Sequence, residues 1–185
     1  MESRQGDAAK SVLVAYASRF GTTVGVAEVV AETARRADWH VRFADMGQIM
    51  AQRLQPESFD LVILGAPIRY DRWLAEARDF VRRNRAALRQ TRTAAFFTCL
   101  TLSRPDQPSR AQAEHYASKI AAILPRTEPR DIGGFAGVLD FAKFPLLQRP
   151  FARILMSTLG VREGDYRDWS AIKTWAQAQL DFDHA

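Results

Sequence analysis

The chain has 185 residues, 47% of them hydrophobic, and its 26 Lys and Arg against 21 Asp and Glu give a formal net charge of +5. This apolar content is enough for one globular domain and excludes disorder over most of the length. One cysteine and three well separated histidines exclude a disulfide framework, and they predict no metal site.

The amino-terminal segment and the basic balance restrict the location and the partners of the chain. Residues 1–10 are polar and lack the apolar core of a signal peptide, and no apolar run reaches about 18 residues. We therefore expect a polar tail over 1–10, one domain over 11–182 and a cytoplasmic protein. The positive charge favours an acidic partner, which on charge alone is nucleic acid, an anionic membrane surface or an acidic small molecule.

Three short apolar runs have the pattern of strands that are buried on both faces of a parallel sheet. They are Ser11–Ala17, Leu61–Ala66 and Ala94–Leu100. His40–Asp45 instead alternates apolar and polar residues, which predicts an edge strand. A glycine-rich run over Ile132–Leu139 predicts a fifth strand.

Helical periods separate these strands, over residues 26–37, 74–88 and 109–124 and from Asp168 onward. Ser109 and Gln112 have the spacing of a capping box, and Pro125 ends that helix. Strand and helix alternate five times, which indicates an α/β fold with an open parallel sheet wrapped by helices.

The segment from Phe141 to Arg162 departs from this alternation. It carries four basic residues, no acidic residue and nine large apolar side chains. It is too long for a simple connection. We interpret it as an insertion between the last strand and the last helix, over about 140–165, with a helix from Pro150 to Leu159.

In open parallel sheets, ligands bind outside the carboxyl ends of the strands, so the loops after the first, third and fourth strands are the candidate sites. The first loop combines hydroxyls, a glycine and the start of a helix, which is the chemistry of a phosphate site and also of an ordinary helix cap. Its residues are Ser18, Arg19, Phe20, Gly21, Thr22 and Thr23.

The other two loops supply aromatic, basic and backbone groups. After the third strand come Pro67, Ile68, Arg69 and Tyr70, which can stack on a planar ring or, alternatively, seal the sheet edge. After the fourth strand come Thr98, Cys99, Leu100 and Thr101, and Cys99 is interpreted as a small buried residue rather than a nucleophile. The arginine-rich helix over 78–92 is interpreted as a solvated face, and no nucleic-acid partner is predicted.

These residues carry a resemblance. The order of the elements and the loop SRFGTT resemble flavodoxin-like domains, which have a five-stranded parallel sheet of order 2-1-3-4-5 and bind FMN. The run Gly65–Trp73, the Gly137-Val-Leu start of the insertion and the Asp168-Trp169 start of the last helix resemble the flavodoxin-type, quinone-dependent protoporphyrinogen IX dehydrogenases of haem synthesis. The similarity extends from Val12 to Leu180.

The resemblance implies a cofactor, a site and a reaction. The residues of the first loop would hold the FMN phosphate, those after the third strand would line the isoalloxazine, and Thr98–Leu102 would form the third flavin loop. The reaction would be oxidation of protoporphyrinogen IX to protoporphyrin IX with a quinone as electron acceptor. No catalytic side chain is assigned, because the flavin supplies the redox chemistry.

Charge supports an enzyme over a carrier, while the alternatives stay open. A cation roughly 8 Å from an anion stabilises it by about 2 kcal/mol at an effective dielectric near 20, so Arg69 and Arg72 would make the flavin a better acceptor. The alternatives are an electron-transfer protein without its own substrate and a module that binds no flavin. The insertion would contact the inner face of the cytoplasmic membrane, a tetrapyrrole substrate, its own domain or another subunit.

Overall fold

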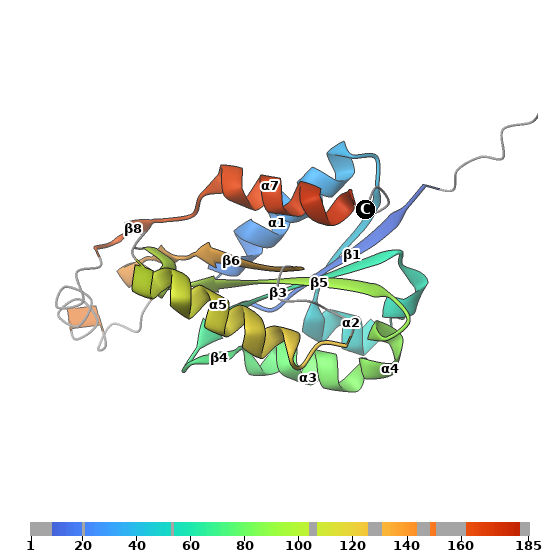
Figure 1. The fold of residues 1–185 in the computed structure, drawn as a ribbon, viewed down its shortest axis with the longest axis horizontal. Coiled ribbons are helices and arrows are strands. Elements are labelled where there is room, and N and C mark those ends of the chain that lie inside the picture. Colours follow the sequence, from blue (N-terminus) through green and yellow to red (C-terminus); the bar gives the residue numbers. More distant parts are fainter. Residues whose placement is uncertain are drawn as a thin grey trace, which may run out of the picture.

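The computed structural model describes residues 9–19, 21–52, 54–103, 107–125, 131–143, 149–150 and 162–181. Its centre is a sheet in which five strands run parallel in the spatial order β2-β1-β3-β5-β6 (Figure 1). These strands are β1 (Ser11–Tyr16), β2 (His40–Asp45), β3 (Leu61–Arg69), β5 (Arg92–Cys99) and β6 (Ile132–Ala136). A short strand, β4 (Arg72–Trp73), pairs antiparallel with the end of β3.

The predicted order 2-1-3-4-5 is confirmed, because these five strands are the first to fifth long strands of the chain. The predicted edge strand His40–Asp45 lies at the β2 edge, with Arg42 exposed and Val41 and Phe43 half-buried. Short apolar runs therefore identified the buried strands correctly, since both faces of such strands are covered.

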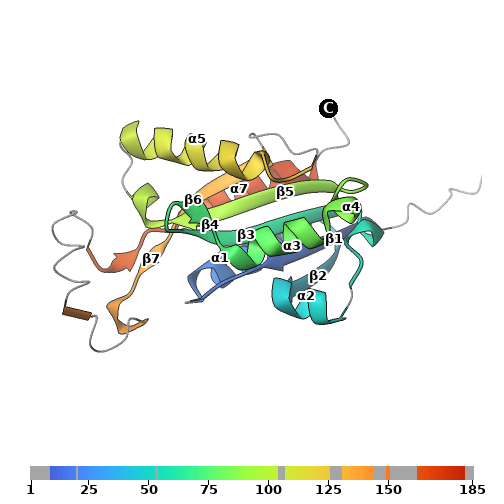
Figure 2. The same cartoon turned by 90° about the horizontal axis from the view of Figure 1, so that it is seen from below.

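Helices cover both faces of the sheet (Figures 1 and 2). One face carries α1 (Thr22–Arg36) and α7 (Trp169–Leu180), and the other carries α2, α3 and α5. Successive residues of each strand point to opposite faces, so Leu13 belongs to one core and Val14 to the other. The remaining helical elements are α2 (Met46–Gln52), η1 (Pro56–Ser58), α3 (Ala75–Arg83), α4 (Arg85–Leu88), η2 (Leu100–Ser103), α5 (Gln107–Ala121) and η4 (Phe141–Lys143).

The two predicted helix starts have different outcomes. Asp168 caps α7, because its carboxylate accepts hydrogen bonds from the backbone N–H groups of Ser170 and Ala171, both at 3.0 Å. The capping box of Ser109 and Gln112 is wrong, since α5 already begins at Gln107. The Ser109 hydroxyl instead donates to the carbonyl of Thr101 at 2.9 Å and ties the helix to the loop after β5.

The glycine-rich run does not form one strand. Beyond Ala136 the chain leaves the main sheet, and β7 (Val138–Leu139) pairs antiparallel with β8 (Gly164–Asp165). The prediction of a strand over Ile132–Leu139 is therefore correct for β6 alone. The ribbon of β7 and β8 brings the two ends of the insertion together (Figure 2).

Several predictions concern residues outside the described ranges. They are the polar tail up to residue 8, the placement of Phe20 and the helix over Pro150–Leu159 apart from its first residue. Among the helices that the structure does describe, none has the length and apolar character needed to cross a bilayer.

Candidate flavin site

The three candidate loops lie at one edge of the sheet because β1, β3 and β5 are neighbours. Tyr16 is in register with Gly65 and Gly65 with Phe96, so the three strands end side by side. A Cβ atom on Gly65 would lie 2.0 Å from the Phe96 ring, and this glycine therefore allows the ring to pack against β3. The sheet thus brings together the loops that were separate in the sequence.

The loop after β1 leads directly into the amino terminus of α1. Gly21 has a φ of 77°, a left-handed conformation that glycine adopts at little cost, and its N–H donates to the Ser18 hydroxyl at 3.1 Å. The N-cap residue of α1 is Gly21, which has no side chain to cap the helix, and no acidic residue lies in the first turn. Apart from the chain neighbours of Gly21, no atom of the described residues lies within 4 Å of the position of a Gly21 Cβ atom. Open, uncapped amides at a helix start are the donor set that a phosphate requires.

The remaining residues of this loop have partners on other elements. Thr22 is half-buried at the first helical position. Thr23 is fully buried and its hydroxyl shares a hydrogen bond of 2.9 Å with the Thr98 hydroxyl at the end of β5. The exposed Arg19 pairs with Glu76 of α3 at 3.0 Å. The loop after β1 is therefore tied to the third candidate loop, after β5, through a buried hydrogen bond.

The residues after β3 form a hairpin rather than an open loop. Tyr70 and Asp71 have φ angles of 49° and 59°, the pattern of a type I′ turn, between the paired residues Arg69 and Arg72. The left-handed region costs an L-residue roughly 1–2 kcal/mol. Tyr70 is 86% exposed, and the Arg69 guanidinium lies 5.2 Å from the centre of its ring. An aromatic ring and a cation therefore project from the sheet edge.

Buried contacts hold the base of this hairpin. The Trp73 indole N–H donates to the Ala66 carbonyl at 3.1 Å, and Trp73 is almost fully buried. The Leu74 N–H donates to the Pro67 carbonyl at 3.1 Å, and the Arg78 guanidinium donates to the Trp73 carbonyl. Pro67 and Ile68, which were predicted to line a flavin, are half-buried beside these contacts.

The loop after β5 is short and helical. Thr98 is buried, Cys99 is half-buried and free, and Leu100 and Thr101 begin η2. Cys99 was predicted to be a small buried residue; it is only half-buried, although it packs against the apolar core. In the described part of the chain, no group of three or more His, Cys, Asp or Glu side chains is arranged to hold a metal.

Sequence reasoning missed three residues of the hairpin's surroundings. Lys119 and Tyr116 on α5 contact Asp71. Glu76 on α3 contacts Arg19. Tyr116 and Lys119 are three residues apart on one helix face, which was the only signal available. A pocket of about 310 Å³ lies between the hairpin, α3 and α5.

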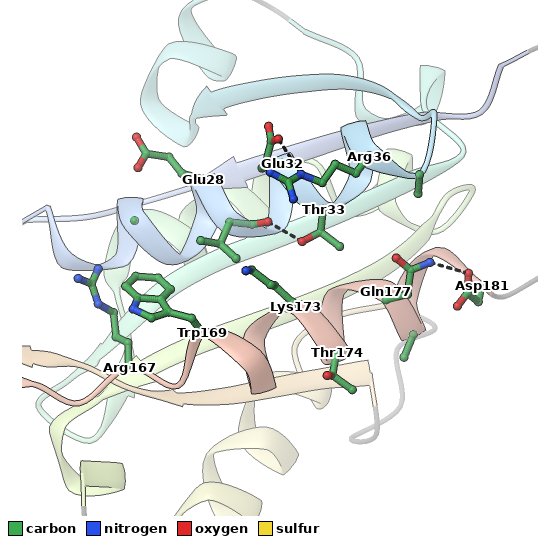
Figure 3. A pocket seen from close by; sticks show the side chains of 14 residues that line it. Glu28, Glu32, Thr33, Arg36, Arg167, Trp169, Lys173, Thr174, Gln177 and Asp181 are labelled. Atoms are coloured by element: carbon green, nitrogen blue, oxygen red, sulfur yellow. Dashed lines mark hydrogen bonds and ion pairs between the residues drawn. The ribbon is translucent and has the colours of Figure 1, made fainter.

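A larger groove, of about 1260 Å³, runs between α1 and α7 (Figure 3). Glu28 and Glu32 of α1 lie on one side, and Lys173 and Gln177 of α7 lie on the other. None of the predicted site residues that the structure describes lines this groove. The candidate flavin site remains the edge where β1, β3 and β5 end, and the groove with the larger volume lies on another surface.

Known proteins resemble this chain over most of its length. A family model described as flavodoxin domain matches residues 13–164. Protoporphyrinogen IX dehydrogenase (quinone) of Escherichia coli strain K12 is 23% identical over 170 residues, which are 89% of this chain and 92% of that protein. The Leishmania major protein of the same name is 27% identical over 123 residues, 64% of this chain and 52% of that protein.

A solved structure shows the same architecture. Oxidised flavodoxin 2 from Bacillus cereus matches with a TM-score of 0.52 and 17% sequence identity, covering 95% of this chain and 99% of that chain. At this identity the likeness concerns the fold alone. It confirms the prediction of a flavodoxin-like α/β sandwich.

Proposed function

Since the chain belongs to the flavodoxin domain family, we propose that it uses FMN to oxidise protoporphyrinogen IX to protoporphyrin IX, with a quinone as the electron acceptor. Family membership confirms the coarser statements, namely a flavoprotein oxidoreductase with FMN as cofactor. The observation that carries the finer proposal is the similarity to quinone-dependent protoporphyrinogen IX dehydrogenase over 89% of the chain.

The amino terminus of α1 would bind the phosphate of FMN. Its N-cap residue, Gly21, has no side chain to cap the amides and leaves open space at the turn. Ser18 would orient this turn, since its hydroxyl accepts the Gly21 N–H. Thr22 would add a hydroxyl, whereas Thr23 would fix the turn to β5 through Thr98. The partial positive charge of a helix start favours a phosphate dianion.

The hairpin and η2 would enclose the ring system of the cofactor. Ile68 and Tyr70 offer apolar and aromatic surface, and Arg69 places a cation at the same edge. The backbone from Thr98 to Thr101 offers N–H and carbonyl groups for the polar edge of the ring. Bound FMN would supply two-electron redox chemistry, so complete oxidation of the substrate would take repeated cycles, each passing two electrons on to a quinone.

The basic side chains favour an acidic, electron-donating substrate. Arg69 and Arg72 face each other across the hairpin, and Arg72 is exposed. Positive charge beside a flavin stabilises its reduced, anionic form and so favours electron acceptance. The same guanidinium groups suit the propionates of a tetrapyrrole, because Arg binds carboxylates through two parallel hydrogen bonds.

The experiment is a visible absorption spectrum in one anaerobic cuvette. FMN is added to the purified protein and the excess is removed, then protoporphyrinogen IX and finally a soluble quinone are added. We expect a bound flavin band that protoporphyrinogen bleaches and the quinone restores. A bound band that does not respond to protoporphyrinogen would overturn the proposed reaction and favour an electron carrier. A protein that retains no flavin would overturn the assignment of the site.

A further inference from the structure

The tip of the β3–β4 hairpin has a backbone that its own residues do not favour. Both central residues, Tyr70 and Asp71, are left-handed, although neither is glycine. Type I′ turns normally carry Asn-Gly or Gly-Gly at these positions. Buried contacts of Trp73 hold the base of the hairpin. Trp73 pairs with Ile68, below the tip that Tyr70 and Asp71 form. The tip therefore needs support from another part of the chain.

Helix α5 supplies that support. The Lys119 ammonium donates to the Asp71 carboxylate at 2.8 Å, across a separation of 48 residues. The hydrogen bond from Lys119 lowers the pKa of Asp71, and a second one from Tyr116 lowers it further. Tyr116 is itself buried against Phe97 of β5, with ring centres 5.7 Å apart. The turn is therefore connected to a rigid part of the core.

We propose that Lys119 and Asp71 are a positioning pair, which holds Arg69 and Tyr70 in the arrangement that binds FMN. This proposal rests on one part of the proposed function, the binding of FMN, and does not depend on the substrate. The pair acts through the hairpin, because Asp71 directly follows the exposed ring of Tyr70 and shares its left-handed turn. A fixed turn lowers the conformational entropy that the hairpin loses when the cofactor binds.

Two single variants distinguish a positioning role of the pair from a direct effect of its charges on the flavin. Lys119→Met removes a cation, while Asp71→Asn removes an anion and keeps a residue that tolerates the left-handed region. If the pair positions the hairpin, both variants weaken FMN binding, by about two- to fivefold, as expected for loss of an exposed ion pair. Both also shift the midpoint potential of the bound flavin in the same direction. If the pair acts by charge alone, the two variants shift affinity and potential in opposite directions.

The measurements are titration of the apoprotein with FMN, followed by flavin fluorescence, and equilibration of the bound flavin with a reference dye. Lys119→Arg retains a cation and is expected to restore wild-type values. Arg82→Met is the matched control, because it breaks an exposed ion pair with Asp79 on α3 at 3.2 Å, which is not part of the hairpin. Thermal unfolding of each apoprotein checks that the variants fold.

The outcomes distinguish this proposal from the proposed function. Opposite shifts in the two variants, or wild-type affinity and potential in both, would overturn the positioning pair. FMN binding that depends on the pair, without bleaching by protoporphyrinogen, would support the pair and overturn the proposed reaction. A wild-type protein that binds no FMN would overturn both.

Discussion

Two turns at the same edge of the sheet adopt left-handed backbone by different means. The turn before α1 uses Gly21, whose φ of 77° costs little because glycine has no Cβ atom. The hairpin turn uses Tyr70 and Asp71 and depends on contacts from α5. The first turn is therefore specified by its own sequence, whereas the second is specified by tertiary structure. The second gains an exposed aromatic ring that a glycine turn could not offer.

The largest expected effect concerns the bond that ties the first turn to the sheet. Thr23→Val and Thr98→Val each leave one buried hydroxyl without its partner, which costs about 1–3 kcal/mol of stability. The double variant removes both hydroxyls, and we expect it to be close to wild type. Urea unfolding of the four proteins, as a double-mutant cycle, measures this coupling. Additive losses would show that the bond does not join the two loops.

The second prediction tests whether Gly21 acts through its backbone. Gly21→Val places a β-branched residue in the left-handed region, although the space around its Cβ atom is open. We expect a loss of roughly 1–2 kcal/mol of FMN-binding free energy, seen as an about five- to thirtyfold decrease in FMN affinity. Gly21→Asn tolerates this conformation and is the control. Equal affinities for the Val and Asn variants would contradict the comparison between the two turns.

The third prediction reverses the comparison by giving the hairpin a glycine. Tyr70→Gly removes an unfavourable left-handed residue, so the protein is expected to gain about 1 kcal/mol of stability. FMN binding is expected to weaken, because the exposed ring is lost. Thermal unfolding and FMN titration measure the two effects separately. A Tyr70→Gly protein that is less stable than wild type would show that the turn is not strained.

The smallest effect is a pH dependence of the hairpin. The pKa of Asp71 is lowered by the hydrogen bonds from Lys119 and Tyr116, so its ionised form is favoured in the folded protein. This contribution is fully present above the unfolded carboxyl pKa of about 3.9 and is lost as the pH falls through the lower folded value. The stability difference between wild type and Asp71→Asn should therefore disappear in acid. Thermal unfolding from pH 7 to about pH 2 tests this, and a difference that is still undiminished at the acid end would assign it to packing.

The fold could be predicted from the sequence because its signals are local. Apolar runs such as Leu61–Ala66 gave the buried strands, and Asp168 gave the start of α7. The capping box at Ser109 failed because its hydroxyl is used by Thr101, a contact between two elements. The strand predicted over Ile132–Leu139 failed because the chain leaves the sheet at Gly137, and composition does not show where a strand changes partner.

In the candidate site, too, local features could be predicted from the sequence and contacts between distant residues could not. The residues of each loop follow from their position after a strand, and the adjacency of the loops follows from the strand order. The hairpin of β3 and β4 could not be predicted, because Tyr-Asp is not a typical sequence for a two-residue turn. Its support by Lys119 is a contact between residues 48 positions apart, for which a single sequence carries no signal.

The ribbon of β7 and β8 holds the two ends of the predicted insertion next to each other. Leu139 and Gly164 are paired neighbours, so the chain leaves the domain and returns to it at adjacent positions, whatever the conformation of the segment between them. The entropy of closing such a loop grows slowly, by about 0.6 kcal/mol for each doubling of its length. Segments of very different length and chemistry could therefore be exchanged at this point during evolution or in the laboratory while the sheet keeps its order.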